Sequence, residues 1–217
     1  FSTPLFVIFS WSLIILSAML ISDNLPIKER YKPFSDALLV LFIDLSVDVI
    51  AIRHKFWFWN EYSFSEGFFG VPANNFIGWL LVAFVFCFVF RFVKNSRLRL
   101  KNIYYVTLPV VSYAVFLFLF YFVDFIEKIL KLNKFIKLFL VLFLILLFLT
   151  VILSNLEKKK KKAQNILLIN LIRIPFHFYA LLGLLTLKVY SNFPTLFVIT
   201  VIILLIDMFL IHYYYKK

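Results

Sequence analysis

Seven long apolar runs constrain this chain more than any other feature of its sequence. They are separated by short polar connections and cover residues 4–22, 35–52, 76–93, 103–123, 136–154, 166–187 and 193–212. A helix needs about 20 residues to cross the roughly 30 Å hydrocarbon core of a bilayer, and it satisfies its own backbone groups there. A transmembrane barrel would instead show short segments of alternating hydrophobicity. The sequence therefore predicts an all-α, polytopic transmembrane bundle of about seven spans.

The composition indicates a single integral membrane domain over residues 1–217. Hydrophobic residues make up 64% of the chain and charged residues 16%, whereas a soluble domain is only about half apolar. The first run has no basic lead and no cleavage site, so we interpret it as a span and not as a signal peptide. Because the sequence begins at Phe1 and not at methionine, we expect it to lack its extreme N-terminus.

The net charge of +12 is concentrated in the connections between the runs. This distribution is typical of the positive-inside rule, so we expect no nucleic-acid partner and interpret Lys158 to Lys162 as a topology signal. Successive connections between spans lie on alternate sides of the membrane. One side carries roughly twice the Lys and Arg residues of the other, and its basic residues lie in Lys28 to Lys32, Arg91 to Lys101, Lys158 to Lys162 and Lys216 to Lys217. The rule predicts a multi-pass protein of the cell membrane, with a cytoplasmic C-terminus and residues 53–75 on the outer face.

Two aspartates interrupt the second run. Asp44 and Asp48 are four residues apart, so on a helix they share one face about 6 Å apart along the axis. A charged aspartate at mid-membrane costs about 2.5 to 3.5 kcal/mol, and such residues mark functional sites by default. Desolvation and mutual repulsion favour one proton on the pair, which then offers an acid beside a carboxylate for general acid and base catalysis. The alternative is a structural pair that is hydrogen-bonded or ion-paired inside the bundle.

The sixth run offers polar partners for this pair. Asn170, Arg173 and His177 lie on one stripe of a helix. Arg173 is a candidate to neutralise an aspartate, and His177 is a candidate to relay a proton or orient a water. A snorkelling or structurally paired arginine and a hydrogen-bonded core histidine fit these positions equally well.

Residues 53–79 combine aromatic side chains with the turn formers glycine, proline and asparagine. The part between the second and third runs is too polar and too short for another span. Trp57, Trp59 and Trp79 suit a membrane interface, and the turn formers predict a re-entrant or interfacial loop that folds onto the bundle mouth. Asn75, at the start of the third run, either caps a helix or faces a substrate.

The remaining features near the ends of the runs are interpreted as structural. Glu61 and Glu66 are expected to be solvated, Asp207 and His212 to be boundary residues of the last run, and residues 124–134 to form a short amphipathic linker. Cys87 is the only cysteine, so no disulfide can form within one chain. Nucleotide-binding, zinc-binding and serine-nucleophile motifs are missing from the sequence. We therefore expect no cofactor and no metal.

The segments FIDLSVDVIAIRHKFWFW and FFGVPANNFIGW resemble a membrane family of carotenoid biosynthesis proteins that includes carotenoid hydratases. In that family a D-L-x-x-[DE]-P helix leads into W-x-W and then into Y-G-V-P-x-x-N-F-x-G-W. PFHFYALL in the sixth run also looks like the family's proline and histidine segment. Val49 stands where the family usually has proline, and Phe69 where it often has tyrosine. The matching positions are Asp44, Leu45, Asp48, Trp57, Trp59, Gly70, Val71, Pro72, Asn75, Phe76, Gly78, Trp79, Pro175 and His177.

The resemblance implies a hydratase that adds water to a terminal (ψ-end) double bond of an acyclic or monocyclic carotenoid. Asp44 or Asp48 would protonate the less substituted carbon, and the other carboxylate or His177 would place the water. The choice between the two aspartates stays open. The expected partners are this lipidic substrate, membrane lipids and other membrane enzymes of the pathway. The predicted substrate-binding residues are Trp57, Trp59, Asn75, Trp79 and Arg173, of which the first two would stabilise the cation through their ring faces.

Two other classes of function fit the same residues. An isoprenoid-transferring enzyme would use Asp44 and Asp48 to hold magnesium against a diphosphate, although a second acidic motif is missing from the sequence. A proton-coupled transporter, or a small structural membrane protein, would use the aspartates and Arg173 as a relay or as internal pairs.

Overall fold

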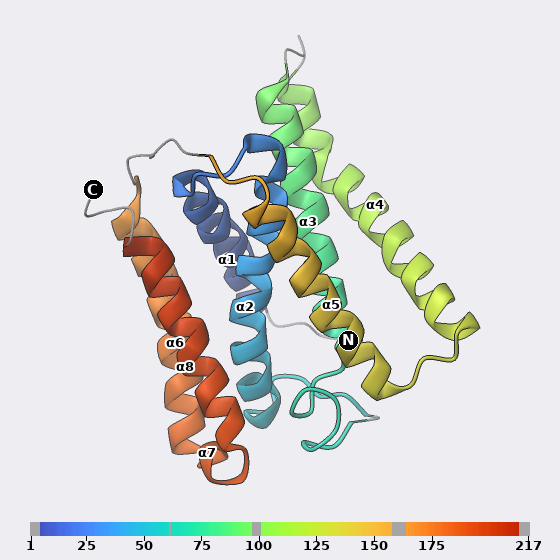
Figure 1. Ribbon diagram of the computed structural model, residues 1–217, viewed down its shortest axis with the longest axis vertical. Helices are drawn as coiled ribbons and strands as arrows, with labels where there is room; N and C mark the ends of the chain where they lie inside the picture. Colours follow the sequence, from blue (N-terminus) through green and yellow to red (C-terminus); the bar gives the residue numbers. More distant parts are fainter. Residues whose placement is uncertain (1–4, 61, 97–100, 158–163, 213–217) are drawn as a thin grey trace.

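The computed structural model describes residues 5–60, 62–96, 101–157 and 164–212, and within these ranges it is helical and contains no strand. Each predicted apolar run forms one long helix, so the predicted all-α bundle is confirmed (Figure 1). Glu61, Arg97, Arg99 and the lysines at 158–162, 216 and 217 lie outside the described residues. The helices are α1 (Leu5–Asn24), α2 (Lys32–Arg53), α3 (Ala73–Asn95), α4 (Lys101–Ile129), α5 (Lys134–Leu153), α6 (Ile166–Thr186), α7 (Val189–Asn192) and α8 (Pro194–His212).

Six of these helices, α1, α3, α4, α5, α6 and α8, are long and apolar enough to cross a membrane. The chain is therefore an integral membrane protein. The seventh long helix, α2, has a similar length but contains Asp36, Asp44 and Asp48. Its charged residues distinguish it from the other six in composition.

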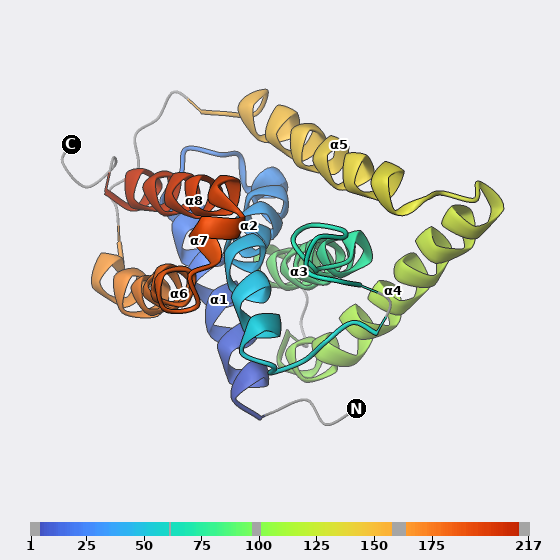
Figure 2. The same ribbon diagram turned by 90° about the horizontal axis from the view of Figure 1, so that it is seen from below.

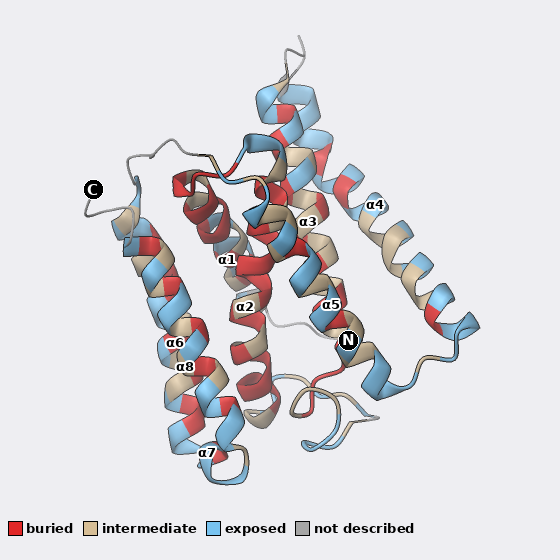
Figure 3. Cartoon of the chain, in the orientation of Figure 1, coloured by how far each residue is buried: buried red, intermediate tan, exposed pale blue. Residues whose placement is uncertain are grey.

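The central position of α2 explains how it tolerates these charges. It packs against α1, α3, α5, α6 and α8, and most of its side chains are buried. The end-on view shows α4 and α5 at the periphery (Figure 2), and buried residues gather on α2 and the neighbouring faces (Figure 3). The outer surface of α4 presents large apolar side chains such as Phe118, as expected of a helix that faces lipid.

The structure corrects the expected linker at residues 124–134. Helix α4 continues to Ile129, and α5 begins at Lys134. An ion pair between Asp124 and Lys128, 2.6 Å long and one turn apart, supports the added helical turn. The side chain of Asn133 accepts a hydrogen bond from the Ile136 backbone nitrogen at 2.8 Å and so caps α5.

The predicted aromatic loop closes one end of the bundle, at the C-terminus of α2 and the N-terminus of α3 (Figure 1). Arg53 fastens it: its Nη1 donates to the carbonyl oxygens of Val49 and Phe69 at 2.8 and 3.0 Å. Gly70 has a φ of 96°, and a Cβ there would lie 2.8 Å from Ile52 Cδ1. The turn therefore requires glycine, and it buries Val71 completely.

Helices α2 and α6 touch closely at Gly183, which gives a test of the packing. A Cβ at this position would lie 2.2 Å from Ile50 Cγ2. We expect Gly183→Ala to destabilise the detergent-solubilised protein by about 1 to 3 kcal/mol, because overpacking forces the helices apart. The measurement is the thermal unfolding midpoint. The matched control is Gly78→Ala, whose Cβ would meet Phe120 at an ordinary 3.4 Å. Equal midpoints for the two variants would contradict the packing described here.

Candidate functional site

Asp44 and Asp48 meet Asn75 at the interface of α2 and α3. The Asn75 Nδ2 donates to Asp48 Oδ2 at 2.7 Å and to Asp44 Oδ2 at 3.2 Å. The aspartates are 0% and 1% exposed. Asn75 does not cap α3, whose N-cap residue is Pro72 and whose N-terminus has no side-chain capping hydrogen bond. The structure therefore joins two predicted catalytic residues and one predicted substrate-binding residue in one buried cluster. We call Asp44 and Asp48 the acid pair, and the Asn75 amide bridges them.

The hydrogen bonding of the acid pair is incomplete. The Oδ1 atoms of Asp44 and Asp48 are buried and have no hydrogen-bond partner within the described part of the chain. No lysine or arginine among the described residues forms an ion pair with either carboxyl. Two full negative charges on one neutral amide would repel each other in this apolar setting. An acid beside a carboxylate fits the geometry better.

A cavity of about 410 Å³ lies between α1, α2 and α6. Val47 and Ala51, which lie just before and one turn after Asp48 on α2, form part of its wall. Trp57 reaches it from the aromatic loop, and Tyr179 reaches it from α6. This α1/α2/α6 cavity has the size and the apolar lining of a small-molecule site, and it borders the helix that holds the acid pair.

A second cavity, of about 380 Å³, lies between α3, α4 and the aromatic loop. Trp59, Asn75 and Trp79, three of the predicted substrate-binding residues, line this α3/α4 cavity together. Trp79 lies one turn after Asn75 on the same face of α3, and its ring stacks on that of Trp11 with centroids 3.4 Å apart. Trp11 lines the α1/α2/α6 cavity. The stacked indoles therefore stand between the two cavities.

Arg173 and His177 bind Asp207 of α8 in the structure. Arg173 Nε donates to Asp207 Oδ2 at 2.5 Å, and His177 Nε2 lies 2.7 Å from the same oxygen. Arg173 also donates to Ser17 Oγ and to the Leu39 carbonyl, at 3.2 and 2.9 Å. The three side chains are at most 2% exposed. The Arg173 cluster thus joins α1, α2, α6 and α8.

The interpretation of Asp207 as a boundary residue is wrong. Its side chain is completely buried, more than one turn before the end of α8 at His212. The physical reason is the charge of Arg173, because a buried guanidinium needs a carboxylate partner and α8 supplies it. His212 does lie at the exposed helix end, where its Nδ1 is 2.9 Å from the Met208 carbonyl oxygen.

Two further buried charge clusters were not found from the sequence. Arg91 binds Asp36 through two hydrogen bonds of 2.7 and 3.0 Å and Asp23 through a third of 2.6 Å. The count of basic residues by connection places Arg91 in a loop. The sequence did contain a signal for this buried cluster, because Asp36 and Arg91 both interrupt apolar runs.

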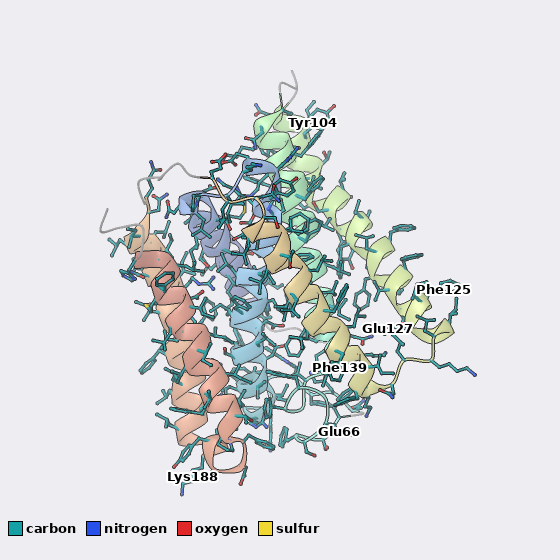
Figure 4. The ribbon with its side chains drawn as sticks, in the orientation of Figure 1. Glu66, Tyr104, Phe125, Glu127, Phe139 and Lys188 are labelled. Carbon is teal, nitrogen blue, oxygen red and sulfur yellow. The ribbon has the colours of Figure 1, made fainter. Side chains whose placement is uncertain are left out.

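The second of these clusters lies beside the aromatic loop. Glu127 on α4 accepts hydrogen bonds from Asn74 on α3 at 2.9 Å and from Lys137 on α5 at 2.6 Å. Figure 4 shows Glu127 where α4 and α5 approach each other near this end of the bundle. Glu66, expected to be solvated, is exposed in the loop and pairs with Lys134 at 3.2 Å. These charged residues therefore connect α3, α4, α5 and the aromatic loop.

Comparison with known proteins gives one match. The family model described as carotenoid biosynthesis protein covers residues 1–148. This range contains the acid pair, Asn75 and the aromatic loop, whereas Arg173, His177 and Asp207 follow it. No curated protein and no solved structure gives a significant match.

The Arg173 cluster generates a stability prediction. Asp207→Asn removes the only carboxylate that the structure places on Arg173 and His177 within the described residues. We expect a loss of about 3 to 5 kcal/mol, because a buried guanidinium is left without its counter-charge. Asp124→Asn, which removes an exposed ion pair with Lys128, should leave stability nearly unchanged. Thermal unfolding in detergent measures both, and an unaltered midpoint for Asp207→Asn would refute the structural role of the cluster.

Proposed function

The chain belongs to the carotenoid biosynthesis protein family, and from this premise we propose that it is a carotenoid hydratase. The proposed reaction adds water to the terminal (ψ-end) double bond of an acyclic or monocyclic carotenoid. One observation carries the proposal: two buried carboxyls, bridged by one neutral amide, lie on a helix that borders an apolar cavity. Such a site can donate a proton to a substrate that has no polar group at its reacting end.

In the proposed mechanism, one carboxyl of Asp44 and Asp48 acts as the acid. Its proton bonds to the less substituted carbon of the double bond, the π electrons form the new C–H bond, and a tertiary cation remains on the other carbon. The oxygen of a water molecule then bonds to the cation. The extra proton on that oxygen returns to the carboxylate, so the acid pair is regenerated and the net change is the addition of one water. Asn75 keeps the two carboxyls adjacent throughout.

The aromatic lining suits the cation in this scheme. Trp57 lines the α1/α2/α6 cavity. Trp11, one of the two stacked indoles, lines it too. An indole face near a desolvated cation contributes about 0.5 to 2 kcal/mol. Trp59 and Trp79 offer similar faces to the α3/α4 cavity. We assign the reacting end to the α1/α2/α6 cavity, because Val47 and Ala51, neighbours of Asp48 on α2, form part of its wall.

The proposed roles of Arg173 and His177 carry different weight in this scheme. Each nitrogen of Arg173 already donates within the bundle, which favours a structural role over substrate binding. His177 binds Asp207 through Nε2, and its buried Nδ1 has no hydrogen-bond partner among the described residues. Its participation in placing water stays a prediction.

Two observations bear on the competing functions and on orientation. Within the described residues, no group of three or more His, Cys, Asp or Glu side chains could hold a metal ion. For orientation, we propose that the bundle end with Lys28, Arg30, Lys32 and Lys94 faces the cytoplasm, because these basic residues are concentrated there. The aromatic loop then faces the outer side.

Replacement of either aspartate tests the reaction. We expect the wild-type protein, expressed in cells that accumulate an acyclic carotenoid, to add the mass of one water per ψ-end. At least one of Asp44→Asn and Asp48→Asn should lower this conversion at least about 100-fold, because a carboxamide cannot donate the proton. Pigment mass spectrometry provides the measurement, at equal membrane expression, with Asp124→Asn as the control. An unchanged pigment with well-expressed wild type would remove the support for hydration.

A further inference from the structure

Tyr179 places a phenol hydroxyl in the α1/α2/α6 cavity. Ser10 and Tyr179 are the two hydroxyl residues in its described lining. The Tyr179 ring is half-buried between its neighbours, and it stacks on Phe56 with an interplanar angle of 11°. Ser10 and Tyr179 therefore contribute hydroxyl groups to the lining of a mainly apolar cavity.

His54 holds this hydroxyl in place. It follows Arg53, the last residue of α2, and its Nδ1 lies 3.0 Å from the Tyr179 oxygen. The two rings are 5.6 Å apart at an angle of 58°, so the contact is made edge to edge through the hydrogen bond. His54 is partly exposed beside the aromatic loop. The bond thus connects the cavity to the rim of the bundle.

The register of α2 and α6 places the backbone of Tyr179 at the level of the acid pair, while its hydroxyl reaches His54, just past the end of α2. Arg173 donates to the Leu39 carbonyl, and ten residues later Gly183 lies against Ile50. These two contacts show that α2 and α6 run in parallel over this distance. Asp44 and Asp48 lie between the contacts on α2, and Tyr179 lies between them on α6.

We propose that Tyr179 is a catalytic residue that binds the attacking water, and that His54 is a positioning residue that orients the Tyr179 hydroxyl. The inference rests on the proposed hydration and adds to it the group that delivers the nucleophile. A tertiary cation in an apolar cavity has few competing nucleophiles, so a water held at a fixed place decides whether hydration follows protonation.

The proposal gives each hydrogen bond a direction. When His54 Nδ1 accepts a hydrogen bond from the phenol O–H, the lone pairs of the Tyr179 oxygen point toward the cavity. They can then accept a hydrogen bond from the water. The water oxygen then directs its own lone pair at the cation and forms the new C–O bond. Its surplus proton passes to the carboxylate that protonated the alkene. Tyr179 and His54 begin and end the cycle in the same protonation state.

Reaction in D₂O separates water delivery from protonation. Deuteration of the alkene followed by loss of the original hydrogen from the same carbon returns the alkene with one deuterium, without any hydration. Membranes with each variant are incubated with the acyclic carotenoid in D₂O, and mass spectrometry measures both hydrated product and deuterium in recovered substrate. Tyr179→Phe keeps the ring but removes the hydroxyl. We expect about a 10- to 100-fold loss of hydration, with deuterium exchange retained.

The His54 variants test positioning. His54→Leu should lower hydration nearly as much as Tyr179→Phe does. His54→Gln should retain part of the hydration activity, because the glutamine carbonyl can accept a hydrogen bond from the phenol O–H. In the Tyr179→Phe background, His54→Leu should cause no further loss, since both changes remove one shared function. Tyr190→Phe, at an exposed position of α7, is the matched control and should behave as wild type.

Each other outcome overturns a defined part of the argument. Wild-type hydration by Tyr179→Phe refutes the role of Tyr179 and leaves the hydratase proposal intact. Loss of exchange together with hydration, at normal expression, refutes water delivery because Tyr179 then affects protonation or folding. A wild-type protein that shows neither exchange nor hydration overturns the hydratase proposal, and this inference with it.

Discussion

A charge inside a lipid-embedded bundle needs a partner, and this constraint determines how the helices surround α2. An unpaired aspartate at the bilayer centre costs several kcal/mol, yet α2 carries Asp36, Asp44 and Asp48. Helix α3 supplies a partner to all three, with Arg91 at one end and Asn75 nearer the other. The helix richest in charge therefore occupies the centre of the bundle, where neighbouring helices, and not lipid, surround it.

The buried clusters differ in how their charges balance. Asp36 and Asp207 each face an arginine at hydrogen-bonding distance, so both charges of each pair are compensated and the clusters join helices. Asp44 and Asp48 share the neutral amide of Asn75. A group of acids that is buried without a cation stores a proton more readily than a compensated ion pair does. This imbalance distinguishes the candidate catalytic cluster from the clusters that stabilise the bundle.

The sequence predicts those features that depend on one helix or one turn. The length of the apolar runs gave the seven long helices, the four-residue spacing placed Asp44 and Asp48 on one face, and turn formers located the aromatic loop. The partner of Arg173 could not be predicted, because α8 meets α6 only through the packing order of the bundle. For the same reason the Trp11 and Trp79 stack joins α1 to α3 without any sequence signal. Tyr179 was missed inside PFHFYALL, because its proposed role depends on His54, which lies just past the end of α2.

The proposed hydration requires both an apolar binding site and a source of water, and the distribution of polar atoms in the cavity fits both requirements. A carotenoid end binds only where the walls are apolar, while a tertiary cation reacts productively only with water. The α1/α2/α6 cavity has mainly apolar walls, with the Tyr179 hydroxyl among its few polar groups. The acid pair is next to Val47 and Ala51 along α2, and the bond to His54 runs toward the rim. Proton donor and water site thus belong to different helices, α2 and α6, and the cavity between them is where an alkene would meet both.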